Sequence, residues 1–157
     1  MEMKLTAKIT AKNAMKLAIA LIALALFAAA AVAADDGGLF IPAKDITEEA
    51  VFYPLEVDGV EMEVFAVKAP DGTIRTAFNT CQVCYDSGYG YYVQDGGVFV
   101  CQNCGNRFRT SDIEIVKGGC NPLPITKDLK TVDENGITIS RELLIKAKPI
   151  FENWKYE

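Results

Sequence analysis

The chain has 157 residues, 50% of them hydrophobic, with 16 basic and 21 acidic side chains, five cysteines and no histidine. That length suits one ordinary domain. The absence of histidine excludes Ser-His-Asp and Cys-His catalysis, Cys₂His₂ zinc fingers and haem with a histidine axial ligand. Soft-metal or redox chemistry must therefore come from sulfur, so the cysteines carry most of the functional information.

The first 34 residues have the pattern of a targeting segment. Four lysines lie within residues 1–16, residues 17–34 carry no charge, and Ala31-Val32-Ala33 supplies small residues at the end of the apolar run. This pattern is typical of a secretory signal peptide, although about 18 apolar residues can also span a bilayer. We expect residues 1–34 to be a signal peptide or an N-terminal membrane anchor, and we favour cleavage. The remainder is then exported, to the periplasm or the cell surface.

The part beyond residue 34 is acidic. Residues 1–34 hold four lysines and one glutamate, so the remainder carries 12 basic and 20 acidic groups, a net charge of about −8. Such a surface repels phosphate backbones. We therefore expect no nucleic-acid partner, and membrane contact only through the N-terminal segment.

An antiparallel meander is predicted before the cysteines. Residues 51–57 are rich in β-branched and aromatic side chains, and residues 60–65 alternate apolar and acidic ones. Asp58-Gly59 between them is a strong hairpin signal, because a type I′ turn needs positive φ at both central positions. A second turn at Asp71-Gly72 leads into a third predicted strand over residues 73–78.

Two Cys-x-x-Cys pairs follow, separated by 16 residues. This spacing is typical of the tetrathiolate site of a zinc ribbon, because two intervening residues let both sulfurs of a pair face one ion. Gln94-Asp95-Gly96-Gly97 predicts a hairpin that brings the pairs together. Structural disulfides, or a redox-active disulfide within one pair, stay open on spacing alone. We predict a metal site with four thiolate ligands: Cys81, Cys84, Cys101 and Cys104.

The fifth cysteine, Cys120, follows Gly118-Gly119, which lets the backbone approach a centre closely. It could ligate a cluster, replace one of the other four cysteines, act as a free thiol beside the metal, or be buried as a small hydrophobe. We expect it to take part at the centre as a cofactor-binding residue. Further on, residues 137–139 predict a short strand, and Ser140 can cap a short helix over residues 141–147.

Several short stretches together resemble a known family. They are Asp58-Gly59-Val60, Phe65-Ala66-Val67-Lys68, Asp71-Gly72-Thr73-Ile74-Arg75, Cys81-x-x-Cys84, Cys101-x-Asn103-Cys104-Gly105-Asn106-Arg107-Phe108 and Gly118-Gly119-Cys120-Asn121-Pro122-x-Pro124. Over most of residues 50–155 the chain resembles the membrane iron–sulfur protein FtrD-like domain family. The resemblance implies iron–sulfur chemistry linked to iron uptake across a membrane, with membrane iron-transport or redox components as partners. Larger members carry many transmembrane helices, so this chain resembles their exported domain standing alone.

These observations predict a mainly β fold. It consists of a small antiparallel meander, an inserted zinc-ribbon or rubredoxin-like double-knuckle module, and a short C-terminal helix. The expected organisation is a signal peptide or membrane anchor over residues 1–34, a linker over residues 35–49, and an FtrD-like Cys-rich metal-binding domain over residues 50–157.

The leading functional hypothesis is an exported metal-binding protein for iron handling or electron transfer at the cell surface. The expected cofactor is iron, as an iron–sulfur centre or a single iron in a Cys₄ site, or Zn²⁺ in its place. One alternative is a structural zinc module in a protein-interaction domain, and another is a thiol–disulfide redox protein. The sequence shows no substrate pocket, so we do not expect an enzyme, although electron transfer stays open.

Overall fold

The structure is a computed structural model that describes residues 32–33 and 37–156. The predicted targeting segment lies outside these residues, apart from Val32–Ala33, which form the two-residue strand β1. None of the helices within the described part of the chain is long and apolar enough to cross a membrane. The described residues belong to one unit that spans residues 31–157.

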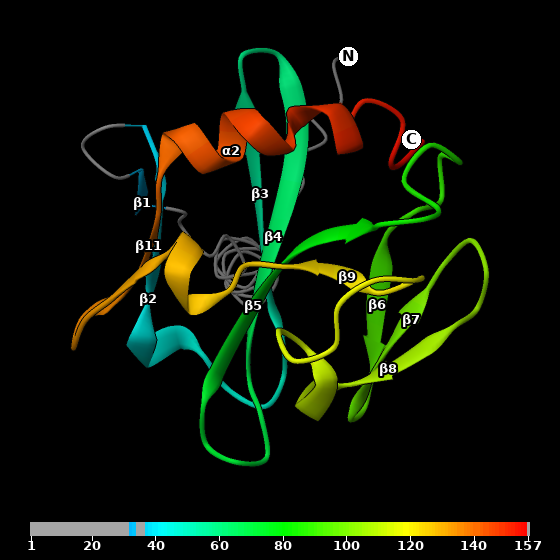
Figure 1. The fold of residues 1–157 in the computed structure, drawn as a ribbon. Coiled ribbons are helices and arrows are strands. Elements are labelled where there is room, and N and C mark those ends of the chain that lie inside the picture. Colours follow the sequence, from blue (N-terminus) through cyan, green and yellow to red (C-terminus); the bar gives the residue numbers. More distant parts are fainter. Residues whose placement is uncertain (1–31, 34–36, 157) are drawn as a thin grey trace, which may run out of the picture. The chain divides into compact units, whose positions relative to one another are not determined.

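The predicted meander forms the central sheet. Asp58 and Gly59 have φ values of 49° and 80°, so the hairpin turn has the positive φ angles expected from the sequence. The third strand extends beyond its predicted end and finishes at Cys81. The sheet is antiparallel in the order β3-β4-β5-β9 (Figure 1): β3 (Val51–Val57), β4 (Val60–Lys68), β5 (Ile74–Cys81) and β9 (Pro122–Pro124).

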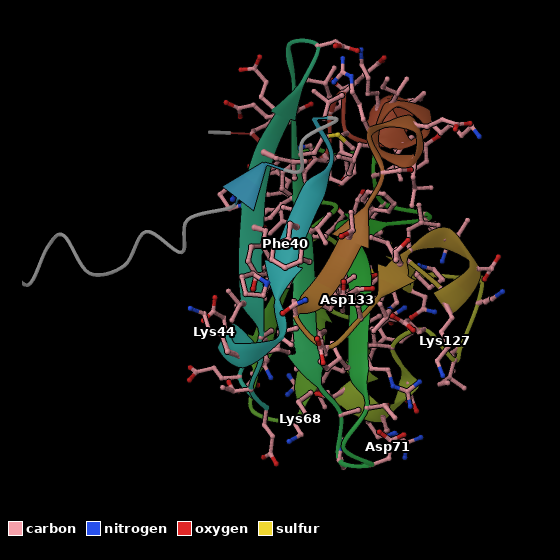
Figure 2. All side chains as sticks on the ribbon, turned by 90° about the vertical axis from the view of Figure 1, so that its left-hand side faces the viewer. Phe40, Lys44, Lys68, Asp71, Lys127 and Asp133 are labelled. Carbon is pink, nitrogen blue, oxygen red and sulfur yellow. The ribbon has the colours of Figure 1, made fainter. Side chains whose placement is uncertain are left out.

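A second antiparallel sheet has the order β1-β2-β11-β10 and includes part of the segment predicted as a linker. Leu39 and Ile41 are buried because they alternate along β2 and point into the core, so these residues are a packed strand. Figure 2 looks onto this sheet and shows Phe40 and Asp133 on the side facing the viewer. β1 pairs with β2 (Leu39–Pro42), β2 with β11 (Gly136–Ile139), and β11 with β10 (Thr131–Val132).

The third sheet follows the first Cys-x-x-Cys pair and contains the predicted hairpin. Its antiparallel order is β6-β7-β8, with the β6–β7 turn at Gly96-Gly97. In Figure 1 it lies on the opposite side of the central sheet from β2 and β11. The strands are β6 (Tyr92–Asp95), β7 (Val98–Cys101) and β8 (Arg107–Arg109).

Helix α2 (Arg141–Ala147) begins where the sequence predicts. The Ser140 side chain accepts a hydrogen bond from the Leu143 N–H at 3.3 Å, which is a normal N-cap. Figure 1 shows α2 near the tip of the β3–β4 hairpin. A 3₁₀ turn, η4 (Lys148–Ile150), continues the helix, and the remaining 3₁₀ turns are η1 (Ala43–Asp45), η2 (Thr110–Asp112) and η3 (Lys127–Leu129).

Two apolar clusters cover opposite faces of β4 and β5. In β4, Val64 and Ala66 belong to the cluster shared with β2, β11 and α2, whereas Phe65 and Val67 belong to the cluster shared with β6 and β7. This follows from the period of two along a strand. The fold is therefore mainly antiparallel β with one short C-terminal helix, as predicted. The second cluster contains all the cysteines except Cys104.

Candidate metal centre

The first cysteine pair sits at the end of strand β5. Cys81 is the last residue of β5, and its backbone N–H donates to the Gly90 carbonyl at 2.7 Å. The chain then turns, and the Cys84 N–H points back at the Cys81 Sγ, 3.3 Å away. Both side chains are buried. A backbone N–H aimed at sulfur stabilises the thiolate form that binds metals.

The second pair repeats this arrangement at the end of strand β7. Cys101 is the last residue of β7 and is buried, whereas Cys104 is exposed. The Gln102 N–H donates to the Tyr91 carbonyl at 2.9 Å. Gly90 and Tyr91 are adjacent in the chain, and each accepts a hydrogen bond from the start of one of the two cysteine turns. These two bonds therefore hold the cysteine pairs side by side.

The loop that carries Cys120 is fixed against the first pair. Gly118 and Gly119 have φ values of 83° and 69°, which residues with side chains rarely adopt. The side-chain amide of Asn121 donates to the Val116 carbonyl, and the Asn121 carbonyl accepts the Gln82 N–H at 3.4 Å. Directly after this loop, β9 pairs with β5. The chain thus returns to the end of the strand that carries Cys81.

All five cysteines are free thiols, and their sulfurs gather at one place. The Cys120 Sγ lies 3.1 Å from the Cys81 Sγ, 3.8 Å from the Cys84 Sγ and 2.7 Å from the Cys104 Sγ. Four sulfurs lie within 4.8 Å of one another, those of Cys81, Cys84, Cys101 and Cys120. Cys104 is outside this mutually close set but in contact with it through Cys120. The close set therefore has Cys120 where the sequence-based prediction had Cys104 as the fourth metal ligand.

The surroundings of the sulfurs are apolar. The second cluster packs Phe65, Phe99 and Ile113 around the cysteines, with the rings of Phe65 and Phe99 stacked at 4.5 Å. Burial raises the pKa of Cys101 to about 12. Burial also favours the protonated form of Cys81, but hydrogen bonds, led by that of the Tyr92 hydroxyl, outweigh it and lower the pKa of this thiol.

These residues suit a thiophilic cation. Thiolates held close together in an apolar cluster repel one another, and a positive ion among them offsets that repulsion. Binding such an ion displaces the protons of the thiols. Sulfur donors without histidine or carboxylate select zinc, copper(I) or iron–sulfur centres over hard cations such as magnesium or calcium. The donor set therefore fits a thiophilic metal, and an iron–sulfur centre is one of those it could hold.

Two further residues near the centre were not predicted as parts of it. Asn79 is buried in β5 and makes two hydrogen bonds to the backbone of Tyr92. The Tyr92 hydroxyl lies 4.0 Å from the Cys120 Sγ. No sequence signal indicates which of the aromatic rings around residue 90 places its polar atom beside the sulfurs.

A family model described as "Membrane iron-sulfur containing protein FtrD-like" matches residues 46–151, which include all five cysteines. No curated protein matches the chain. The match extends from the residue after η1 to the residue after η4, so it covers the central sheet, the sheet of the second pair and helix α2. The cysteine cluster is consistent with the iron–sulfur chemistry in the family description. The chain therefore belongs to the FtrD-like family of membrane iron–sulfur containing proteins.

Proposed function

We propose that this protein is exported, binds iron through its cysteine thiolates, and serves iron handling or electron transfer on the outer side of the cytoplasmic membrane. The observation that carries the proposal is the convergence of four sulfurs to within 4.8 Å of one another. The family description supports iron–sulfur chemistry over other uses of clustered thiols. Export rests on the basic, apolar and A-x-A pattern of residues 1–34.

The proposed metal ligands come from both cysteine pairs, and Cys120 adds a fifth sulfur. Iron held by thiolates supplies one-electron chemistry when it is bound. The chain contributes N–H donors, as in the 3.3 Å contact from the Cys84 N–H to the Cys81 Sγ, and an apolar wall that keeps water from the buried sulfurs. The proposed ligand set is Cys81, Cys84, Cys101 and Cys104, with Cys120 able to replace Cys104, whose Sγ lies 2.7 Å from its own.

The two sides of the centre differ in access. Cys81, Cys84 and Cys101 are buried, Cys120 is half-buried and Cys104 is exposed. A metal held here would thus meet solvent, or a partner protein, on the side of Cys104. Since the family is described as membrane-associated, membrane iron-transport or redox components are the proposed partners. Within the chain, residues 50–157 are the proposed metal-binding domain and residues 1–34 the targeting segment.

Metal analysis of the full chain, purified without oxygen, tests the proposal. We expect iron in the native protein, together with visible thiolate-to-iron absorption, and loss of both in Cys101→Ser. Ala66→Ser is the matched control, because it also buries a hydroxyl but in the cluster away from the sulfurs. It should keep the iron.

Two other results would overturn the proposal, each in favour of a different function. A colourless protein with one zinc per chain would point to a structural zinc module, because zinc has no redox chemistry. A metal-free protein whose cysteine pairs cycle with dithiothreitol would point to a thiol–disulfide redox protein.

A further inference from the structure

Tyr92 is packed with the cysteines in the second apolar cluster. It is the first residue of β6 and pairs with Cys101 across the β6–β7 ladder. The side chain is 1% exposed, and its ring packs edge-on against Phe108 with centroids 6.1 Å apart. Tyr92 belongs to the second apolar cluster, so its hydroxyl is buried together with the ring.

The backbone of Tyr92 is fixed by one buried side chain. The Tyr92 N–H donates to the Asn79 Oδ1 at 2.8 Å, and the Asn79 Nδ2 donates to the Tyr92 carbonyl at 3.3 Å. Asn79 lies two residues before Cys81 in β5. These two hydrogen bonds therefore join strand β6 to the strand that carries the first cysteine pair, and they fix the position of the Tyr92 side chain relative to that pair.

Among the described residues, the Tyr92 hydroxyl contacts sulfur and meets no oxygen or nitrogen acceptor. Its distance to the Cys120 Sγ is 4.0 Å, and the Cys81 Sγ lies 3.1 Å from that sulfur. A buried hydroxyl normally finds a hydrogen-bond partner, and a thiolate is a far better acceptor than a thiol. Once metal binding removes the protons from the sulfurs, the sulfurs can only accept, and the phenol remains as a donor.

We propose that Tyr92 is a positioning residue of the metal centre, whose hydroxyl donates a hydrogen bond to a ligand thiolate, Cys81 or Cys120, and favours the reduced state of bound iron. The inference rests on the proposed iron-binding function. Reduction adds negative charge to the iron and its sulfurs, so a fixed donor stabilises the reduced state more than the oxidised one. Tyr92 therefore raises the reduction potential.

The matched pair of variants is Tyr92→Phe and Tyr53→Phe. Tyr53 is also a buried tyrosine, but it belongs to the other apolar cluster and its hydroxyl lacks a partner among the described residues. In the full chain loaded with iron, Tyr92→Phe should lower the reduction equilibrium constant about tenfold, which corresponds to about 59 mV for one electron. Tyr53→Phe should leave the potential at the native value, with iron content unchanged in both.

Cobalt(II) loading gives a readout that does not depend on the native metal. Loss of a hydrogen bond raises the energy of the sulfur lone pairs, so the thiolate-to-cobalt bands of Tyr92→Phe should move to lower energy than those of native protein and Tyr53→Phe. If the purified protein holds no iron, the proposed function fails, yet the cobalt bands still test Tyr92. Native-like cobalt bands in Tyr92→Phe would overturn the inference.

A third variant of the chain tests the inference if Tyr92→Phe does not fold. 3-Fluorotyrosine at position 92 retains the hydroxyl and the packing and makes the hydroxyl a stronger donor. The cobalt bands should then move to higher energy and the iron potential should rise. Unchanged bands, or a shift in the same direction as that expected for Tyr92→Phe, would contradict donation to sulfur.

Discussion

A buried ion pair gives the sharpest stability prediction. The side chains of Lys130 and Glu114 are 2% and 6% exposed and contact each other. The Glu114 carboxylate also accepts the Thr76 N–H at 2.6 Å, and the Lys130 ammonium donates to the Thr76 hydroxyl at 2.8 Å. Burial lowers the pKa of Lys130, and the hydrogen bond to Glu114 opposes that shift. The group joins the loop before Cys120 to β5.

Lys130→Met removes the ammonium while keeping most of the side-chain volume. It leaves the Glu114 carboxylate buried without a counter-charge, and breaking a buried pair in this way costs about 3–5 kcal/mol. A typical domain has a total stability of about 5–15 kcal/mol, so this variant should be close to unfolding. Adding Glu114→Gln removes the unpaired buried charge, so we expect the double variant to recover most of the lost free energy of unfolding.

Urea unfolding, followed by the fluorescence of the one tryptophan, Trp154, measures these free energies. Lys146→Met is the matched control, because Lys146 forms a pair with Glu142 in which the side chains are 68% and 78% exposed. Exposed pairs of this kind contribute about 0.3–0.5 kcal/mol. If Lys130→Met loses less than about 1 kcal/mol of unfolding free energy, or if the double variant is less stable than Lys130→Met, the buried pair does not contribute as we expect.

Three further changes give distinct outcomes. The hydrogen bond from Arg141 holds the pKa of Asp58 below its usual value, so the stabilisation by this carboxylate is present at pH 7 and fades as the pH falls below about 4. Asp58→Asn should therefore melt below native protein at pH 7, with a smaller difference at pH 3. Ser140→Ala should cost about 0.5–2 kcal/mol in urea unfolding, because the Leu143 N–H loses its cap. Cys104→Ser should keep metal but release it faster to a chelator, and complete loss of metal would contradict replacement by a neighbouring sulfur.

The predictable parts of the fold have local causes. The β3–β4 hairpin follows from Asp58-Gly59 and from alternation along both strands, and the helix start follows from Ser140. The cysteine spacing alone predicted that the two pairs converge. These signals lie within a few residues of the structure that they predict, so no partner from a distant part of the chain is needed to read them.

The features that the sequence did not predict depend on distant partners. Pro122 and Pro124 suggest a break in regular structure, yet they form β9, which is possible because β9 is an edge strand and needs few N–H donors. That pairing brings Cys120 to Cys81. In the same way, Leu39 and Ile41 are buried because β11 pairs with β2, and nothing in residues 35–49 indicates that partner.

X-ray absorption at the iron edge of the purified full chain identifies the bound metal and its ligand atoms together. We expect iron whose nearest shell consists of sulfur only, since the chain has no histidine and the centre is built from cysteines. Cys101→Ser should lose that iron. A nearest shell of oxygen or nitrogen, or a sulfur shell around zinc with no iron in the protein, would contradict this expectation.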